Sequence, residues 1–182
     1  MKSKKTLGEI TTYISKGVVP KYAKKGSSET IRVLNQRCNK NNKISLENSR
    51  LHDMTQRRVP DDKKLKINDV LINSTGIGTA GRVAQITEIN EPMTVDGHMI
   101  ILRPKDNINP TYYGYLVMAN QYRIEQMAEG STGQTEINRD RLLNEILCYV
   151  PTMGEQKRIG YQLQRLDLKI NLNNQINDNL FA

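Results

Sequence analysis

The sequence predicts an α+β protein, with a mixed α/β domain over residues 1–151 and one long helix over residues 152–182. Three observations support this. Short apolar runs between glycine and asparagine turns indicate strands, a capped amphipathic stretch indicates a helix within the domain, and a heptad pattern indicates the C-terminal helix. A chain of 182 residues can form one full domain and an appendage, but not two ordinary domains.

The predicted strands are short runs rich in Val, Ile and Leu. The first covers residues 30–34 and precedes a strongly polar tract, residues 36–42, which is typical of a loop that faces a ligand. The turn signal Asn68-Asp69 introduces an apolar run that predicts a buried strand. The other predicted strands are residues 82–86, a return strand for 70–72, and residues 99–102 and 146–150.

A helix is predicted to begin at Asn109-Pro110. Asn caps the unpaired amides, and Pro at the first helical position has no N–H that would need a partner. Apolar and aromatic residues recur at helical spacing up to about Ala128, at Tyr112, Tyr115, Leu116, Ala119, Tyr122 and Met127. Gly130 and Gly133 are expected to end this element, and a second, short helix is predicted over residues 139–144.

The C-terminal helix has the clearest sequence signal. Thr152 and Glu155 form a capping box, which predicts where the helix starts. A coiled-coil seam with alternating four- and three-residue steps follows, with Asn177 in its one gap: Ile159, Leu163, Leu166, Ile170, Asn173 and Leu180. Such a narrow stripe favours a second helix as partner; the alternative is a helix that lies along its own domain.

The net charge of +8 is unevenly distributed. Residues 1–66 hold 17 Lys/Arg against 6 Asp/Glu, whereas residues 67–182 hold 10 against 13. A basic face of this kind attracts a polyanion and releases its counterions, so nucleic acid is the first partner to consider. A solvated lysine-rich surface that maintains solubility is the alternative.

Several motifs suggest chemistry without supporting it. Residues 76–81 match the GxGxxG dinucleotide fingerprint, but a strand-like stretch follows where a phosphate-binding helix is required. Residues 109–112 resemble the Asn-Pro-Pro-Tyr motif of DNA amino-methyltransferases, but they lack the second proline and an adenosylmethionine domain. Pro60-Asp61 and residues 155–157 have the residue types of a metal-dependent nuclease, without any sign of converging on one site.

These observations argue against an enzyme, a cofactor or a metal site. Cys38, Cys148, His52 and His98 are scattered along the chain, and a buried or incidental role is favoured for both cysteines. No run reaches the roughly 18 apolar residues that span a bilayer, and the basic N-terminus lacks the apolar stretch of a signal peptide. We therefore expect a cytoplasmic protein that does not interact with membranes.

Residues 130–135, Gly-Ser-Thr-Gly-Gln-Thr, are small or hydrogen-bonding residues between two predicted helices. Ser, Thr and Gln side chains can bond base edges or phosphates, and Gln can pair with adenine in two places. This segment is either part of a nucleic-acid contact or an ordinary polar loop.

The chain resembles one repeat of the specificity (S) subunit of type I restriction–modification enzymes. Four stretches, in order and spread over nearly the whole chain, carry the likeness: residues 7–10 with 15–17; residues 68–76 continuing to 81–83; residues 95–98 with Ile100 and 103–104; and residues 130–135 with Pro151 and 155–159.

The resemblance implies a DNA target-recognition domain that reads half of a split site, followed by a helix that acts as a spacer. That helix is also implied to dock methyltransferase (modification) subunits, and possibly a restriction subunit, which would supply the catalysis. Family members usually carry two such repeats, whereas this chain carries one. It is therefore either a half-subunit that forms a homodimer through its helix or a piece of a longer protein.

The residues proposed to contact double-stranded DNA combine basic, hydroxyl, amide and aromatic side chains on the expected loops and in the basic N-terminal third. They are Lys16, Tyr22, Arg37, Lys40, Thr75, Arg82, His98, Thr132 and Gln134. The competing interpretation is a stand-alone dimeric DNA-binding regulator without an enzyme partner. An enzyme in its own right, a nuclease or a methyltransferase, is the other rival.

Overall fold

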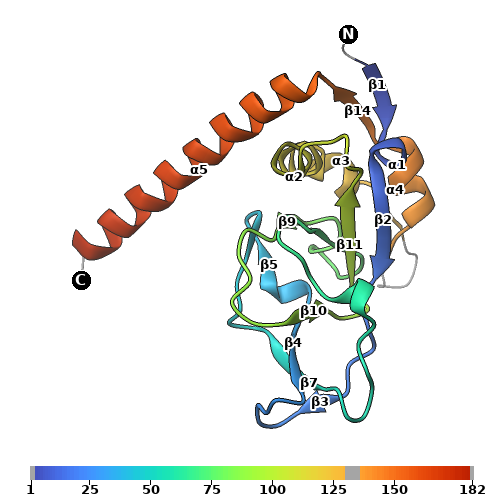
Figure 1. The fold of residues 1–182 in the computed structure, drawn as a ribbon, viewed down its shortest axis with the longest axis vertical. Coiled ribbons are helices and arrows are strands. Elements are labelled where there is room, and N and C mark those ends of the chain that lie inside the picture. The colour runs from blue at the N-terminus through green and yellow to red at the C-terminus, as the bar shows by residue number, and fades with distance from the viewer. Residues whose placement is uncertain (1–2, 130–135, 181–182) are drawn as a thin grey trace.

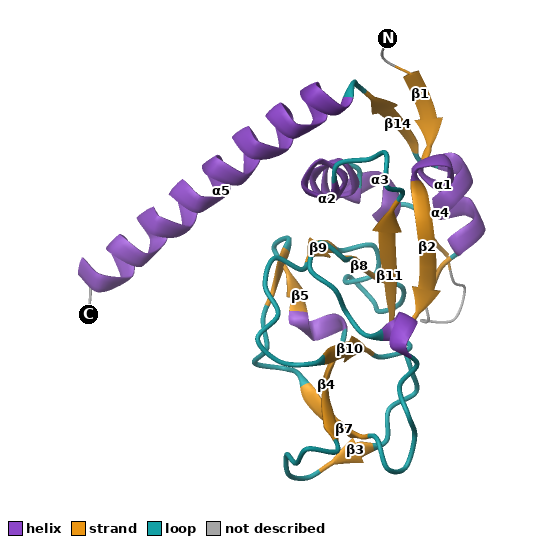
Figure 2. Ribbon diagram, viewed as in Figure 1, coloured by secondary structure: helices purple, strands orange, loops and turns teal. Residues whose placement is uncertain are grey.

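A four-stranded antiparallel sheet lies at the centre of the protein (Figures 1 and 2). The computed structural model describes residues 3–129 and 136–180. The strand order is β2 (Thr11–Lys16), β11 (Met99–Pro104), β8 (Val70–Asn73) and β9 (Val83–Gln85). The predicted strands at 70–72, 82–86 and 99–102 are confirmed, and β9 is the return strand of β8 as expected.

Both faces of this sheet are buried. Val70 and Ile72 on β8 pack into the cluster under the helices, whereas Leu71 between them packs into a second cluster on the opposite face. On β11 the same alternation separates Ile100 from Ile101. Because both faces are covered, the sequences of these strands are continuously apolar and do not alternate between apolar and polar residues. This continuous pattern is what predicted them as buried strands.

A second four-stranded sheet, which we call the distal sheet, extends the domain at its lower end in Figure 1. Its strand order is β10 (Met93–Val95), β4 (Thr30–Leu34), β7 (Arg50–Asp53) and β3 (Tyr22–Ala23). Gly17 connects the two sheets: a Cβ there would lie 2.1 Å from the Val95 carbonyl oxygen, so this crossing requires glycine.

The polar tract at residues 36–42 is less irregular than predicted. It contains a 3-10 helix, η1 (Gln36–Cys38), and the first strand of a hairpin, β5 (Asn39–Lys40) with β6 (Lys43–Ile44). Asn41 and Asn42 make the turn with φ of 54° and 57°, and asparagine tolerates this left-handed conformation well. A second 3-10 helix, η2 (Asp61–Lys63), precedes β8.

Helices cover the face of the central sheet to which Val70 and Ile72 contribute. They are α1 (Leu7–Ile10), α2 (Pro110–Ala119), α3 (Gln121–Glu125) and α4 (Arg139–Glu145). Two further strand pairs complete the domain: β1 (Ser3–Thr6) with β14 (Leu147–Val150), and β12 (Ala128–Glu129) with β13 (Glu136–Ile137). The expected cap is present, since Asn109 Oδ1 accepts from the Tyr112 N–H at 2.9 Å.

The single helix predicted up to about Ala128 is wrong in two respects: the helical part ends at Glu125, with Ala128 already in strand β12, and it is interrupted. It breaks at Asn120, which has φ −95° and ψ 5° and whose side chain donates to the Leu116 carbonyl. The chain then turns into α3, and Tyr122 is 73% exposed instead of lying on a buried stripe. A side chain that bonds a nearby carbonyl competes with helix continuation, and spacing alone does not register this.

The long helix α5 (Met153–Leu180) leaves the domain at its upper end and runs outward, so its C-terminal end lies away from the other helices (Figure 1). The predicted capping box is present: the Thr152 N–H donates to Glu155 Oε2 at 3.1 Å, and the Glu155 N–H to Thr152 Oγ1 at 3.4 Å. Within residues 3–129 and 136–180, no helix is both long and apolar enough to cross a membrane.

Both cysteines are buried, as the sequence favoured, and neither forms a disulfide bond. Burial raises the pKa of the Cys38 thiol and raises that of Cys148 to about 11, so neither forms the reactive thiolate near neutral pH. We expect no reaction of the folded protein with a thiol reagent at pH 7.5, and two equivalents after unfolding in urea. Rapid labelling of the folded protein would contradict this.

Candidate nucleic-acid interface

Four of the proposed DNA-contacting residues meet at one end of the central sheet. Lys16 on β2, Ile100 on β11, Ile72 on β8 and Val83 on β9 form one row across the sheet. In an antiparallel sheet, a strand that ends on this row lies beside one that begins there. The sheet therefore gathers Lys16, the last residue of β2, and three residues in the segments just beyond the row: Thr75, Arg82 and His98.

Hydrogen bonds hold this end of the sheet together. Thr75 Oγ1 lies 2.7 Å from His98 Nδ1 and 3.5 Å from Gln36 Oε1. The Ser74 N–H donates to the His98 carbonyl at 2.8 Å. Asp96 accepts from the His98 N–H at 2.9 Å, and burial raises the pKa of the Asp96 carboxyl. Thr75 and His98 are thus presented as one hydroxyl–imidazole pair, and we call its surroundings (residues 16, 36–40, 74–82, 96–98 and 136–138) the loop face.

The glycine-rich segment at residues 76–81 is a strand connection, as expected, and not the start of a helix. Gly76 and Gly81 have φ of 116° and 86°, and a Cβ on Gly81 would lie 2.6 Å from the Glu125 Cα. Arg82 folds back across the loop and donates to the Gly78 carbonyl at 3.0 Å. These residues bring backbone amides and one guanidinium to the loop face, where a dinucleotide site would need a helix N-terminus.

Arg37 and Lys40 are exposed beside this loop. Their segment is bound to it from both sides: Asn39 donates to the Arg82 carbonyl at 2.9 Å, and Asn73 donates to the Gln36 carbonyl at 3.0 Å. Asn39 and Asn73 are fully buried. The structure therefore brings two more of the proposed cations to the edge of the loop face on a firmly held segment.

β13 completes the loop face on its other side. Thr75 forms an isolated β-bridge with Glu136, and the Ile137 N–H donates to the Ser74 carbonyl at 2.8 Å. Lys16 forms an ion pair with Glu136. Gln36 and Glu136 are residues that sequence reasoning missed, because neither carries a local signal. Thr132 and Gln134 lie outside the described residues.

Tyr22 does not belong to this group. It lies on β3, the edge strand of the distal sheet, and its ring stacks on the Arg50 guanidinium with 3.5 Å between Arg50 Cζ and the ring centroid. The sequence grouped Tyr22, which lies in the basic N-terminal third, with the other candidates, but strand pairing places it in another sheet.

A comparison with protein families decides the relationship of this chain to known proteins. The model described as "Type I restriction modification DNA specificity domain" matches residues 2–181. The chain belongs to this family. The resemblance inferred from the four sequence stretches is therefore confirmed, as is the α+β fold of such a domain with a long C-terminal helix.

Solved structures show the same specificity-domain fold. An S subunit of a type I restriction–modification system from M. genitalium is 17% identical with a TM-score of 0.65, and the match covers 94% of this chain and 40% of that one. The HsdS subunit from Thermoanaerobacter tengcongensis is 18% identical with a TM-score of 0.63, covering 94% and 38%. This specificity domain thus spans about two fifths of their length. No curated protein matches the chain.

The specificity domain contacts its own α5 from Gln156 to Asn171, whereas the described residues beyond Asn171 are exposed. Gln156 is buried and accepts from the Asn109 N–H at 2.8 Å, and a Cβ on Gly160 would lie 3.1 Å from the Tyr112 nitrogen. Farther along, Tyr115 donates to Asp167 at 2.6 Å, and Lys43 bonds Asn171. Burial and the Asp167 carboxylate raise the pKa of Tyr115. These contacts set the angle at which α5 leaves the domain.

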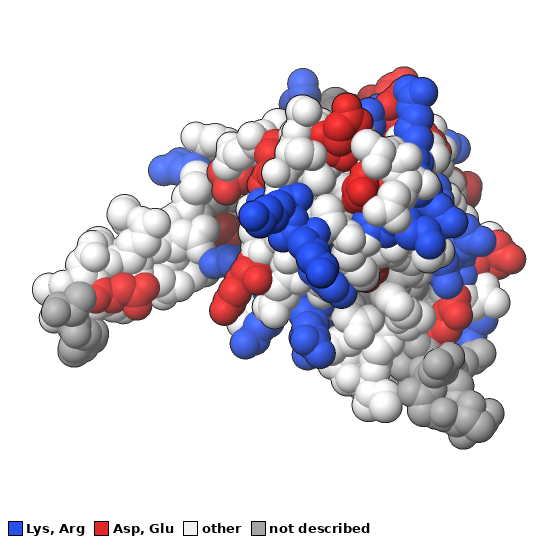
Figure 3. Space-filling model, turned by 90° about the horizontal axis from the view of Figure 1, so that it is seen from below, with Lys and Arg blue, Asp and Glu red and all other residues white. Residues whose placement is uncertain are grey.

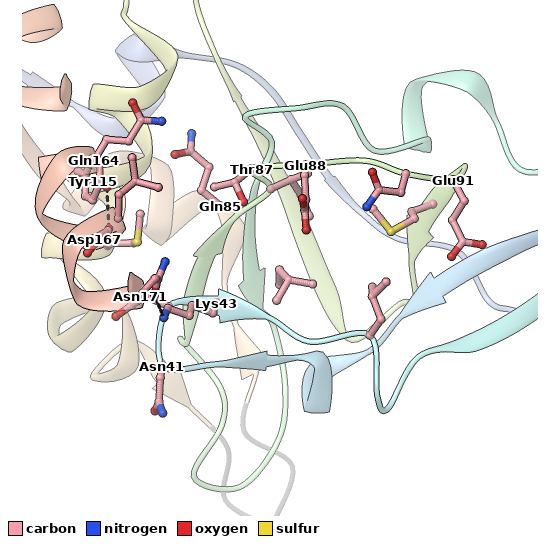
Figure 4. A pocket seen from close by; sticks show the side chains of 18 residues that line it. Asn41, Lys43, Gln85, Thr87, Glu88, Glu91, Tyr115, Gln164, Asp167 and Asn171 are labelled. Carbon is pink, nitrogen blue, oxygen red and sulfur yellow. Dashed lines mark hydrogen bonds between the residues drawn. The ribbon is translucent and has the colours of Figure 1, made fainter. Parts of the chain in front are cut away.

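A groove of about 440 Å³ lies beside these contacts, between α5, α2 and the chain from Gln85 to Met93 (Figure 4). Leu168 and Met118 provide apolar lining, and Glu88, Glu91 and Asp167 provide carboxylates. These carboxylates would repel the phosphates of DNA, so the groove does not belong to the candidate DNA-binding surface. Among the described residues, no cluster of three or more His, Cys, Asp or Glu could hold a metal ion.

The predicted seam of α5 lies beside the face that packs on the domain. Ile159 and Leu163 are partly buried, whereas Leu166, Ile170 and Leu180 are 58%, 53% and 74% exposed, and Asn173 is exposed. The alternative of a helix lying along its own domain thus applies only to the first part of α5. The exposed part of the seam lacks a partner within the described chain.

Proposed function

We propose that this chain is the DNA-reading, non-catalytic specificity subunit of a type I restriction–modification complex, and that its domain reads one half of a bipartite site. The observation that carries this proposal is the loop face. Lys16 lies far in the sequence from Thr75, Arg82 and His98, yet strand pairing brings the four residues to one end of the central sheet in a member of the DNA specificity family.

The loop face offers the two kinds of contact that DNA recognition needs. The Thr75 hydroxyl and the His98 imidazole suit hydrogen bonds to base edges, whereas Arg37 and Lys40 on the rim suit phosphates. The polar residues Thr132 and Gln134 are added from the sequence. Phosphate contacts set the position of the domain on the duplex, and base contacts select the sequence.

We further propose that the seam of α5 pairs two copies of the chain, and that the helix serves as the dock for methyltransferase subunits. The matched S subunits are more than twice as long as this chain, so two copies would provide the same number of domains. A two-fold homodimer would read two copies of one half-site, separated by the length of the paired helices.

Selection of bound duplexes from a randomised DNA library tests the proposal. We expect one short sequence to be recovered twice, in inverted orientation at a constant spacing, by the protein alone or together with a methyltransferase subunit. Recovery of a single uninterrupted motif that no methyltransferase subunit affects would favour the stand-alone regulator. A library that remains random would overturn the proposed function.

Two variants on the loop face separate base reading from phosphate binding. Thr75→Val keeps the side-chain shape but removes the hydroxyl, so we expect binding to the selected sequence to weaken by about 1–3 kcal/mol, with relaxed preference at one base pair. Lys40→Ala should weaken binding to all sequences alike. It should also lower the slope of log K against log salt concentration by the amount expected for the loss of about one phosphate contact. Fluorescence anisotropy measures both.

Lys105→Ala is the matched control, because Lys105 is exposed just beyond the opposite end of β11. It should bind like the unmodified protein. If Thr75→Val weakens selected and unrelated sequences equally, Thr75 does not read a base.

A further inference from the structure

The edge of the distal sheet carries exposed positive charge away from the loop face. The edge strand β3 is flanked by lysines on its own segment, and arginines come from β7 and the turn that follows it. The exposed cations are Lys21, Lys24, Lys25, Arg50, Arg57 and Arg58. Figure 3 looks at the lower end of the molecule, where this sheet lies, and shows Lys and Arg side chains gathered near the middle of the face among scattered Asp and Glu.

The neighbouring carboxylates are largely occupied by other partners. Asp53 accepts hydrogen bonds from Thr55 and Gln56, which lower its pKa. The hydrogen-bond partners of this carboxylate are therefore residues of its own turn. Asp61 pairs with Lys64, and Asp62 accepts from Tyr13. Among the residues that the structure describes, none of the six cations forms an ion pair with a carboxylate.

One of these cations is held in a defined position. Arg50 stacks on the ring of Tyr22, which is 42% exposed. Stacking on an aromatic ring fixes the plane of a guanidinium and leaves its N–H groups at the edge, in the fork that matches a phosphate. The Tyr22–Arg50 pair thus has the geometry of an anion-binding group.

His52 connects the two segments that carry the other cations. It lies on β7, is fully buried, and its Nε2 is 2.7 Å from the Arg57 carbonyl oxygen. Its Nδ1 lies 2.8 Å from the Lys21 backbone nitrogen and 3.1 Å from the Lys21 carbonyl oxygen. One imidazole therefore holds the Lys21 segment and the Arg57–Arg58 turn at a set separation.

The distal sheet also lies directly beyond the loop face. Lys16 ends β2. The Gly17 N–H still donates to Met99 O on β11 at 3.1 Å, and the Val18 N–H donates to Val95 O on β10, in the distal sheet, at 2.9 Å. β3 lies at the opposite edge of this sheet from β10. A duplex that extends from the loop face along the whole distal sheet would reach β3. Its backbone provides a regular row of phosphates that suits several cations on one edge.

We propose that the β3 edge of the distal sheet is a second, sequence-independent phosphate-binding surface, and that His52 is a positioning residue that aligns its two basic segments. This inference rests on the proposed function, because the phosphates belong to the duplex whose bases the loop face reads. Tyr22 acts here through Arg50 and not through a base, so its role differs from that of the loop-face candidates.

The slope of log K against log salt concentration tests the surface, because its magnitude decreases by about 0.9 for each phosphate that the protein no longer neutralises. We expect Lys24→Ala with Lys25→Ala to lower the slope by up to about two, and Arg50→Ala to lower it by about one, on every DNA sequence. The control pair Lys4→Ala with Lys105→Ala lies on other exposed segments and should leave the slope unchanged.

The positioning role of His52 has its own readout. His52→Leu removes both hydrogen bonds, whereas His52→Asn can keep an acceptor for the Lys21 N–H. We expect the magnitude of the slope to fall in the Leu variant and to recover partly in the Asn variant. If the Leu variant does not fold, the Asn variant still provides a measurement. A merely structural role would lower the melting temperature and the active fraction but leave the slope of the active protein unchanged.

The outcomes separate the two proposals. An unmodified protein that binds no DNA overturns the proposed function together with this surface. Sequence-selective binding with an unchanged slope in the Lys24/Lys25 and Arg50 variants overturns the surface alone. If those variants keep their slope but no longer bind a methyltransferase subunit, the edge is a protein-binding surface and the phosphate assignment is wrong.

Discussion

Replacing Leu166 and Ile170 with Asp together is expected to halve the solution mass, from twice 20.8 kDa to 20.8 kDa by light scattering. Both side chains lie on the seam and are more than half exposed, so the domain itself does not depend on them. In a paired helix they would be buried, and an unpaired carboxylate there costs more than such a narrow interface can offset. Leu163 is less suitable for this test because the domain partly buries it.

Leu168 and Leu172 provide the matched control for this experiment. They lie on the same helix and are 62% and 56% exposed, close to the values for Leu166 and Ile170, but they are not seam positions. The corresponding double Asp variant should keep the mass of the dimer. A monomeric unmodified protein would rule out self-assembly, and dissociation of the control variant instead of the seam variant would place the interface on another face of α5.

Asp69→Asn is expected to destabilise the domain by about 3–5 kcal/mol, because it leaves the largely buried Arg103 charge without its counter-ion. The side chains of Asp69 and Arg103 are 2% and 14% exposed. Their pairing is bidentate, with Arg103 Nε 2.7 Å from Asp69 Oδ1 and Arg103 Nη2 2.9 Å from Asp69 Oδ2. Arg103 also donates to the carbonyls of Asp62 and Lys64 and stacks on Tyr13, so it joins β11 to the chain that precedes β8.

Urea unfolding monitored by circular dichroism measures this destabilisation. Glu145→Gln is the control, since the Arg141–Glu145 pair is an i,i+4 pair on the surface of α4 whose side chains are 36% and 47% exposed; its removal should cost less than about 1 kcal/mol. Replacing both Asp69 and Arg103 with apolar residues should cost less than Asp69→Asn alone. Equal destabilisation by Asp69→Asn and Glu145→Gln would show that the bidentate pair contributes no more than a surface pair.

The strands and caps were predictable because their signals are local. The central strands are buried on both faces, so continuous apolar runs such as residues 70–72 and 99–102 identified them. Asn109 and Thr152 cap helices through bonds to residues three positions away, which the sequence displays directly. The break at Asn120 was missed since a side chain that bonds the Leu116 carbonyl looks like any other polar residue at that spacing.

The candidate site was only partly predictable. Residue type made Lys16, Thr75, Arg82 and His98 candidates, but their common location follows from the pairing of β11 with both β2 and β8. Strand pairing also separated Tyr22 from this group by placing it opposite His52 in another sheet. Gln36 and Glu136 entered the loop face through contacts with Thr75 that no spacing rule could reveal.

By itself the sequence determined the α+β class, the family, the helix starts at Asn109 and Thr152 and the seam of α5, because apolar periodicity and capping act over a few residues. Only the tertiary structure decided which residues share the loop face, which part of the seam stays exposed, and that His52 links Lys21 to Arg57. Those outcomes depend on strand order and register, which contacts between distant segments select. The energies of such contacts arise only when the chain has brought the segments together, so they leave no local pattern in the sequence.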